Sequence, residues 1–310
     1  MNVNNYNFGI IGCGNLGFPL ALKLSQINAL EFVFCRNEKK QEKLLLNNIE
    51  QTKIIQSNQL LIQYFQKSNL PNVIIIAVSD DAIDEIIELL SNNLPKLTKT
   101  TYIFHTSGFL SFEPLLKLNY DKLKVFTAHP FQTFYEAKPD IFTNLIWGIE
   151  KGTAEKSEID GIISTLSGIP YYLNFSKEEQ KQIYHLVAVA SSNFLKASLE
   201  FAKILAKEIK LNNPEIIKQI VNRSVDDVFA HFNDDEFTLT GPIARKDLTT
   251  IQKHFSALAG NEVLQEIYAE FSLATIDILK LKKIINLKEE KKFKKIIMQH
   301  IEKDQECSKL

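Results

Sequence analysis

Three glycines near the start of the chain are the first residues whose spacing suggests chemistry. Gly12, Gly14 and Gly17 form a G-x-G-x-x-G sequence between a short apolar segment and a helical pattern. In that setting the glycines permit a tight turn, a close approach of pyrophosphate to the backbone, and close packing of helix on strand. Free N–H groups at the helix start attract anions. We predict that Gly12, Gly14, Asn15, Leu16 and Gly17 bind a dinucleotide; a glycine-rich turn without a ligand is the alternative.

The end of the second apolar segment bears on the choice between NAD and NADP. An NAD enzyme places a carboxylate on the ribose 2′-hydroxyl about twenty residues after the glycines. Here the segment ends in Cys35-Arg36-Asn37, and a guanidinium can pair with a 2′-phosphate instead. Arg36 therefore favours NADP, although the nearby Glu38 leaves NAD open.

Polar residues also follow three further apolar segments. Ser79 and Asp80 come after the first, His105 and Ser107 end the second, and His129 ends the third. Ligands bind outside the carboxyl ends of parallel strands, so these groups would meet at one crevice. We predict that Ser79, Asp80 and Ser107 contact the cofactor and that His129 is catalytic. The alternatives are a helix cap for Asp80, a turn for Ser107 and a core imidazole for His129.

A long helical pattern from about residue 176 to about residue 210 carries another polar group. At about 100° per residue, His185, Ser192 and Lys196 form one stripe, with Asn193 at its edge. Because imidazole exchanges protons near neutral pH, we predict His185 as general acid, with Asn193 orienting the substrate and Ser192 contacting it. Solvation of the whole stripe is the alternative.

The segment Leu239-Thr-Gly-Pro-Ile-Ala-Arg245 forms a last candidate group. Gly-Pro predicts the start of a helix, and its free N–H groups near Arg245 would suit an anionic part of the substrate. Thr240 and Arg245 are therefore predicted substrate contacts. Simple helix capping beside a solvated charge run is the alternative.

The elements that must position these residues alternate between strands and helices as far as residue 175. Such alternation implies right-handed crossovers and a doubly wound, mostly parallel Rossmann-type α/β sheet. The expected strands cover residues 8–11, 31–35, 54–55, 72–77, 101–104, 124–128, 145–149 and 169–173.

After residue 175 the pattern is helical to the end, which predicts an all-α C-terminal domain. We expect a dinucleotide-binding domain at residues 1–175 and a helical substrate and dimerisation domain at 176–280. A lysine-rich helical tail would follow at 281–310. Its ten lysines and five acids, counted from Lys280, give a charge of +5. Packing of this tail on its own dimer is the plain interpretation, and attachment to an anionic membrane or partner is the alternative.

Composition narrows the class of protein. The 36 basic and 37 acidic residues give a net charge of −1, which argues against a nucleic-acid partner. The longest apolar run, Val73 to Val78, is far below the ~20 residues of a membrane-spanning helix, and the N-terminus lacks a signal-peptide pattern. Cys13, Cys35 and Cys307 fit neither a zinc motif nor a disulfide framework. We expect a cytoplasmic protein with reduced thiols, no bound metal and no transmembrane segment.

The ordered set of motifs resembles an uncharacterised bacterial family with a Rossmann-like NADP-binding domain and a helical domain of unknown function. That family lies close to pyrroline-5-carboxylate reductase and to the superfamily with the 6-phosphogluconate dehydrogenase C-terminal fold. The resemblance implies NADP binding and a helical domain that often dimerises, but it supplies no substrate. Its landmarks are Gly12-Cys-Gly-Asn-Leu-Gly17, Ala77-Val-Ser-Asp-Asp-Ala-Ile83, His105-Thr-Ser-Gly108, His129-Pro-Phe-Gln-Thr-Phe134, Tyr184-His185, Ser192-Asn193 and Leu239-Thr-Gly-Pro-Ile-Ala-Arg245.

One departure from the wider superfamily bears on the reaction. Its β-hydroxyacid dehydrogenases carry a catalytic lysine one helical turn before an asparagine, and four residues before Asn193 this chain has Val189. The resemblance therefore argues against a hydroxyacid dehydrogenase that uses lysine as acid and base. His185, two turns before Asn193, would replace the lysine, or the reaction would need little acid catalysis, as imine reduction does.

Together these features predict an NADP(H)-dependent oxidoreductase that moves hydride to or from a C=O or C=N group of a small, anionic metabolite. We expect a homodimer formed through the helical domain. A non-catalytic NADP-binding sensor or scaffold is one alternative. A prephenate-dehydrogenase-like enzyme, suggested by His129-Pro130 after a strand, is another.

Overall fold

The structure of the chain is a computed structural model that describes residues 6–66, 70–136, 138–234 and 237–307. It divides into two compact units. We refer to residues 1–196 as the sheet unit and to residues 197–310 as the helical unit. The predicted domain boundaries, including the separate tail, remain predictions.

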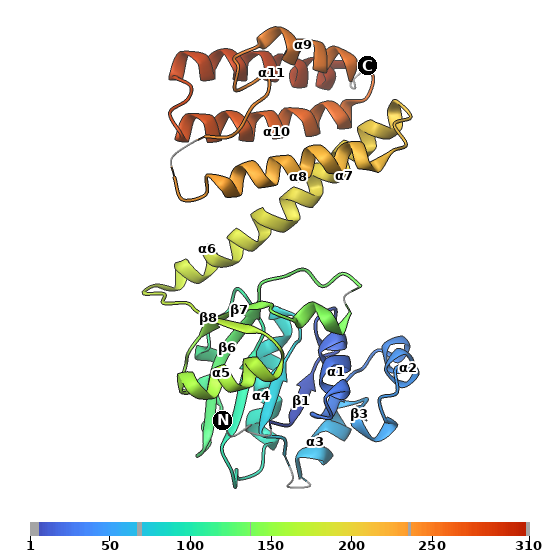
Figure 1. Cartoon of the computed structure of the whole chain (residues 1–310), viewed down its shortest axis with the longest axis vertical. Coiled ribbons are helices and arrows are strands. Elements are labelled where there is room, and N and C mark those ends of the chain that lie inside the picture. Colours follow the sequence, from blue (N-terminus) through green and yellow to red (C-terminus); the bar gives the residue numbers. More distant parts are fainter. Residues whose placement is uncertain (1–5, 67–69, 137, 235–236, 308–310) are drawn as a thin grey trace. The chain divides into compact units, whose positions relative to one another are not determined.

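A single sheet dominates the sheet unit (Figure 1). Its strand order in the described residues is β3-β2-β1-β4-β5-β6-β7-β8, and every neighbouring pair is parallel except β6 and β7. This order confirms the predicted mostly parallel α/β sheet. The strands are β1 Phe8–Ile11, β2 Leu30–Phe34, β3 Ile54–Ile55, β4 Val73–Ile76, β5 Thr101–His105, β6 Leu123–Pro130, β7 Ile146–Glu150 and β8 Ile169–Tyr172.

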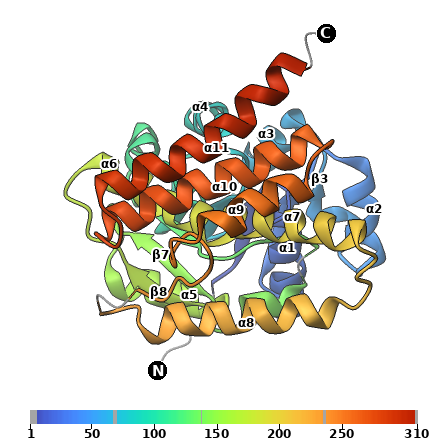
Figure 2. The ribbon, with the colours of Figure 1, turned by 90° about the horizontal axis from the view of Figure 1, so that it is seen from above.

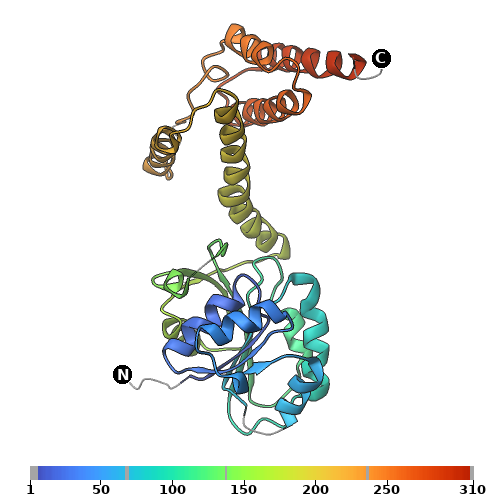
Figure 3. The same cartoon turned by 90° about the vertical axis from the view of Figure 1, so that its right-hand side faces the viewer.

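Helices cover both faces of the sheet (Figures 1 and 3). Successive side chains of a strand point to opposite faces, so each central strand contributes to two cores. Ile10 of β1 packs in the core that contains α1 and α5, whereas Ile11 packs in the core that contains α3 and α4. The helices are α1 Gly17–Gln26, α2 Glu38–Leu46, α3 Asn58–Gln66, α4 Ile83–Asn93 and α5 Lys156–Thr165.

The parallel strands β2, β1, β4, β5 and β6 all end at the same edge of the sheet. Gly12 follows β1 there, and His129 lies near the end of β6. Three inter-strand steps of about 4.8 Å separate β1 from β6, or roughly 14 Å. A ligand that reaches from the glycine loop to His129 would therefore need to span about that distance.

The long helical pattern is formed by α6 Glu178–Ala188, a π-helical segment Val189–Phe194 and α7 Leu195–Glu208. In a π-helical segment the backbone hydrogen bonds join residues i and i+5, so each turn contains more residues than a turn of α-helix. The constant rotation used to place His185, Ser192 and Lys196 on one stripe therefore fails after residue 188.

The helical unit contains α8 Pro214–Ala230, α9 Leu248–Ala257, α10 Glu262–Leu281 and α11 Leu287–Cys307. Figures 1 and 2 show α9, α10 and α11 side by side, and Phe255, Ile276 and Ile297 belong to their shared core. This region confirms the predicted all-helical C-terminal half. Within the part of the chain that the structure describes, no helix is long and apolar enough to cross a membrane.

The helix start predicted at Gly241-Pro242 is wrong. These residues open a turn in which Gly241 has a φ of +108° and the Arg245 N–H donates to the Gly241 carbonyl at 3.0 Å. The next helix, α9, begins at Leu248, and the Asp247 carboxylate caps it by accepting from the Thr250 N–H at 3.0 Å. The Arg245 N–H is therefore bonded within this turn and is not free at a helix start.

Candidate functional site

A cavity of about 330 Å³ lies beside the glycine sequence. We call it the glycine-loop cavity. It contains residues that follow β1, β2 and β4, three adjacent strands of the sheet. Its lining includes Gly12, Cys13, Gly14, Cys35, Arg36, Asn37 and Ser79.

The backbone of this loop fits a dinucleotide pyrophosphate. A Cβ on Gly12 would overlap the Ala77 carbonyl, and a Cβ on Gly17 would overlap the Gly12 carbonyl oxygen. At Gly14, by contrast, a Cβ would have no neighbour within 4 Å. Two glycines thus close the turn, and the third leaves open space where a phosphate group could approach the backbone. Asn15 and Leu16 complete the turn before α1.

Basic side chains lie on both sides of this loop. The Arg36 guanidinium is 5.9 Å from the Phe34 ring centroid, within the range of a cation–π contact. Lys40 and Lys43 of α2 line a second cavity of about 330 Å³ together with Gly14 and Asn15. The sequence reasoning missed both lysines, although their positions in the helix directly after Arg36 were a usable signal.

The other predicted cofactor contacts differ in placement. Ser79 is exposed and lines the glycine-loop cavity, while Asp80 is exposed at the start of a short 3₁₀ turn. Ser107 is buried, and its Oγ accepts from the backbone N–H groups of Phe109 at 3.1 Å and Leu110 at 2.9 Å. Ser107 therefore caps a turn.

A third cavity, of about 350 Å³, lies where β6 meets the long helix. We call it the histidine cavity. It brings together four residues that the sequence predicted: His129, His185, Ser192 and Asn193. The remaining lining residues are Phe131, Gln132, Thr133, Ala188, Val189 and Ser191.

His129 is held by a tyrosine that the sequence reasoning did not assign a role. The His129 Nδ1 and Tyr184 Oη atoms are hydrogen-bonded at 3.0 Å. Two glycines make room for this pair. A Cβ on Gly108 would lie 2.9 Å from the His129 ring, and a Cβ on Gly148 would overlap the Tyr184 hydroxyl. The requirement for small residues at both positions fixes where the imidazole sits.

Burial, with smaller contributions from the nearby His185 and Lys181, lowers the pKa of His129 to about 4. The imidazole is therefore uncharged at neutral pH. Burial also raises the pKa of Tyr184, so its hydroxyl stays protonated. The pair presents neutral hydrogen-bonding groups rather than a charge to the histidine cavity.

Lys181 is a second group that the sequence reasoning missed. Its side chain is only 3% exposed, and its Nζ lies 2.6 Å from Glu150 Oε2 and 2.9 Å from Thr127 Oγ1. Thr127 and Glu150 are cross-strand partners on β6 and β7. Because Lys181 precedes His185 by one helical turn, this buried ion pair anchors α6 to the sheet directly beside the histidine cavity.

Ser192 lies in the π-helical segment and has an unusual environment. Its Oγ is inaccessible to solvent and has no hydrogen-bond partner within the described chain. A buried hydroxyl without a partner costs about 1–3 kcal/mol, so it calls for an explanation such as a ligand. π-helical segments also occur frequently at functional sites.

His105, expected as a second histidine at the crevice, has a structural role instead. Its ring is fully buried, with Nε2 2.8 Å from the Ser111 carbonyl oxygen. Its Nδ1 accepts from the Ser107 N–H at 3.3 Å. Burial lowers its pKa to about 4, so the ring stays neutral. His105 thus fixes the loop after β5 and is not available to a substrate.

Thr240 and Arg245 belong to the helical unit, where both are exposed. Their part in a substrate site remains a prediction. Among the described residues, no cluster of three or more metal-ligating side chains occurs.

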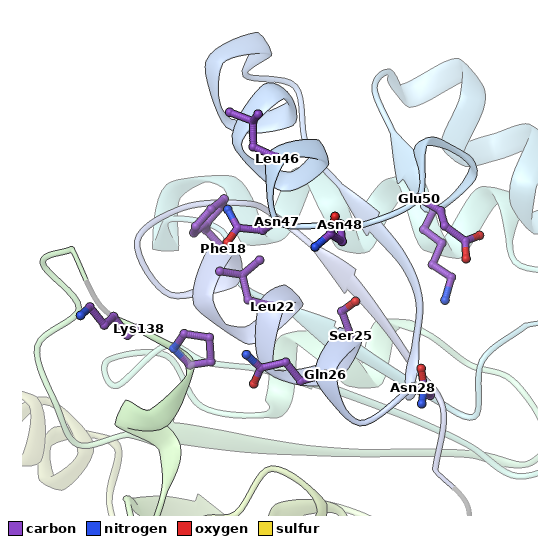
Figure 4. A pocket seen from close by; sticks show the side chains of 12 residues that line it. Phe18, Leu22, Ser25, Gln26, Asn28, Leu46, Asn47, Asn48, Glu50 and Lys138 are labelled. Carbon is purple, nitrogen blue, oxygen red and sulfur yellow. The ribbon is translucent and has the colours of Figure 1, made fainter.

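A larger cavity, of about 830 Å³, lies along α1 and the end of α2 (Figure 4). Figure 4 shows Phe18 and Leu22 of α1 beside Asn47 and Asn48. Its described lining has neither a histidine nor a residue of the Gly12–Gly17 turn. Volume alone therefore does not identify the functional site. The glycine-loop cavity and the histidine cavity, which lie at the carboxyl ends of parallel strands, are the stronger candidates. We call these two the strand-edge cavities.

Comparison with known families adds a match over the second half of the molecule. Residues 145–275 match the family described as Domain of unknown function (DUF2520). The matched region includes Lys181, His185, Ser192 and Asn193 but not the glycine loop. No curated protein matches the chain in sequence.

Solved structures show the same fold at low sequence identity. A candidate NADP oxidoreductase from Bacteroides fragilis is 20% identical, with a TM-score of 0.65 over 86% of this chain and 96% of that chain. A reductive aminase from Aspergillus terreus, in complex with NADPH and ethyl-5-oxohexanoate, is 13% identical, with a TM-score of 0.54 over 96% of this chain and 94% of that one.

Pyrroline carboxylate reductase from Plasmodium falciparum, with NADP bound, is 14% identical, with a TM-score of 0.50 over 94% of this chain and 98% of that chain. These similarities and the DUF2520 match confirm the expected resemblance. At such identities they show a shared fold.

Proposed function

We propose that the chain is an NADP(H)-dependent oxidoreductase that reduces, or forms, a C=O or C=N group in a small, anionic metabolite. One observation carries this proposal. The glycine-loop cavity and the histidine cavity both lie at the carboxyl ends of parallel strands in one unit, with β1 and β6 roughly 14 Å apart. That span suits an extended dinucleotide with its pyrophosphate at one end and its reactive ring at the other.

The cofactor end would use the backbone of Gly12, Gly14, Asn15, Leu16 and Gly17 for the pyrophosphate. Arg36 would pair with the 2′-phosphate, and the geometry adds Lys40 as a second cation for it. We retain Ser79, Asp80 and Ser107 as proposed contacts of the ribose region. Ser79 is the best supported, because it lines the glycine-loop cavity with Arg36.

The substrate end would use the histidine cavity. When bound, NADPH supplies the hydride that reduces the C=O or C=N carbon. We propose that His185 donates a ring proton to the oxygen or nitrogen of that group. Asn193 would orient the substrate, and the unpartnered Ser192 hydroxyl would hydrogen-bond to it. His129, neutral and fixed by Tyr184, would hold the substrate.

We also propose a homodimer formed through the helical unit. α8 has no buried residue in the described chain, although Ile220 and Phe229 are apolar and exposed. Such surface is normally covered by a partner. Ile220→Glu should shift the sedimenting species from dimer to monomer, and an unchanged sedimentation coefficient would rule out this face. A cytoplasmic location is proposed from the reduced Cys13 and Cys35.

The enzymatic role can be tested by following consumption of NADPH with a panel of carboxylated ketones and cyclic imines. Once a substrate is found, His185→Ala should lower turnover about 10²–10⁴-fold, the usual contribution of a positioned acid. NADPH affinity should stay the same. His231→Ala, in the helical unit, is the matched control and should keep full turnover.

Other results would point elsewhere. Loss of NADPH binding in His185→Ala would assign this residue to the cofactor. NADPH binding without turnover of any compound would favour the non-catalytic sensor.

A further inference from the structure

Two cysteines from different strands meet at the glycine-loop cavity. Cys13 lies between Gly12 and Gly14 after β1, and Cys35 directly follows β2. β1 and β2 are neighbouring parallel strands, with Ile11 opposite Phe34. Both cysteines line the glycine-loop cavity, and Cys13 packs against the core cluster that contains Cys35. The two thiols lie close enough that each shifts the pKa of the other, in the part of the molecule that would hold the cofactor.

The surroundings make the two thiols chemically unequal. The neighbouring Cys13 thiol lowers the pKa of Cys35 to about 7, and the Asn37 backbone and the Lys40 charge act in the same direction. The Cys35 thiol and burial raise the pKa of Cys13. At neutral pH about half of Cys35 is thus available as a thiolate nucleophile, and its neighbour retains a proton.

We propose that Cys13 and Cys35 are a dithiol modification site, which a small peroxide converts to an intramolecular disulfide. The Cys35 thiolate attacks the peroxide, so that an S–O bond forms, the O–O bond breaks and one hydroxide leaves. The Cys13 sulfur then attacks the oxidised Cys35 sulfur, forming the S–S bond and breaking the S–O bond. The Cys13 proton leaves with the second hydroxide as water. Overall, two thiols are oxidised and one hydrogen peroxide is reduced to two waters.

Access restricts the oxidant to small molecules. Cys35 is only 1% exposed, while Cys13 is partly exposed, so reagents must enter through the glycine-loop cavity. Hydrogen peroxide is small enough to enter this cavity of about 330 Å³. Cytosolic disulfides are commonly transient and redox-sensing, which is compatible with the expected reducing compartment.

The disulfide would change the cavity that the cofactor needs. It ties the residue between Gly12 and Gly14 to the end of β2, so the loop can no longer adjust to an incoming phosphate. Oxidation should therefore lower dinucleotide affinity, a consequence that rests on the proposed function. Disulfide formation itself does not depend on it.

Mass spectrometry of the full-length protein tests the site directly. The three cysteines fall in separate tryptic peptides: residues 1–23, 24–36 and 304–309. After treatment with hydrogen peroxide and alkylation of the remaining thiols, peptides 1–23 and 24–36 should appear linked, with about 2 Da lost for the two hydrogens. Dithiothreitol should release them. Cys307→Ser is the matched control and should form the same link.

Cys13→Ser and Cys35→Ser should each abolish the link. The proposal fails if wild-type protein gives no linked peptide while Cys307 is oxidised, or if Cys35 goes only to sulfinic acid. NADPH titration of the oxidised protein separates the two proposals. A linked peptide with no NADPH binding before or after oxidation contradicts the cofactor proposal and leaves the disulfide site standing.

Discussion

The two strand-edge cavities of the sheet unit differ in what forms their walls. The glycine-loop cavity is shaped by backbone, and its defining feature is the absence of side chains at Gly12, Gly14 and Gly17. The histidine cavity is shaped by side chains that buried polar contacts hold in place, chiefly the His129–Tyr184 hydrogen bond and the Lys181–Glu150 ion pair. Both cavities are assembled from separate segments: the first from residues that follow β1, β2 and β4, and the second from residues at the end of β6 and in the long helix.

This difference predicts different responses to mutation. A backbone cradle is sensitive to any added atom, whereas a side-chain cavity is sensitive to the loss of a partner. The following substitutions are chosen to separate the two.

Removal of the buried lysine should have the largest effect on stability. Lys181→Ala leaves the Glu150 carboxylate without its partner, and breaking such a pair costs about 3 kcal/mol or more. Chemical denaturation should show this loss. Lys203→Ala, which removes an exposed partner of Glu200, should cost less than about 0.5 kcal/mol.

A second variant distinguishes the unpaired charge from lost packing. Lys181→Met with Glu150→Gln should recover most of the stability, because no charge is then left buried. Equal stability of Lys181→Ala and wild type would mean that the ion pair does not hold α6 at the histidine cavity.

Two alanine substitutions in the glycine loop should act differently from each other. Gly12→Ala forces a side chain into a φ of +108° and against the Ala77 carbonyl, so it should cost about 2 kcal/mol of folding stability. Gly14→Ala meets open space and should fold normally, yet weaken NADPH binding about tenfold by obstructing the pyrophosphate. Thermal melts and NADPH titration measure the two effects. Equal melting temperatures for the two variants would refute the backbone-cradle description.

The pH dependence of stability should show the smallest effect. The folded state holds the pKa of His129 near 4, below its ordinary 6.5, so the unfolded chain binds more protons between those values. Stability must therefore rise with pH across that window and fall as pH drops through it. From about pH 7 to about pH 5.5 this one group should cost about 1 kcal/mol.

His129→Gln removes the titrating ring and should flatten the pH profile by that amount, as measured by denaturant titration at each pH. His105 keeps part of the slope in this variant, because burial lowers its pKa to about 4 as well. Identical profiles for wild type and His129→Gln would contradict burial of a neutral imidazole.

The strands and the glycine loop were predictable because each is specified by a short continuous stretch of sequence. The strands at Phe8–Ile11 and Ile54–Ile55 have the predicted bounds, since short apolar runs between polar residues have few other ways to bury themselves. The placement of Gly12 between β1 and α1 likewise follows from local context.

The side-chain-formed part was predictable only in outline. Nothing in the sequence around Lys181 indicates that its side chain is buried, because its partners Glu150 and Thr127 lie 31 and 54 residues away. The π-helical segment at Val189–Phe194 breaks the regular period on which the helical wheel depends. At Gly241-Pro242 we expected a helix start, but the carbonyl groups of these two residues accept hydrogen bonds from Arg245 and Asp247 and so form a turn.

The central claim is that the sheet unit binds NADP(H) through the glycine loop and Arg36. Isothermal titration of the wild-type chain with NADPH and with NADH tests it most directly, alongside Arg36→Ser. A charge-assisted pair with the 2′-phosphate should favour NADPH by about tenfold or more, and Arg36→Ser should remove that preference while leaving NADH affinity unchanged. Binding of NADH as tight as that of NADPH, or binding of neither, would contradict the account.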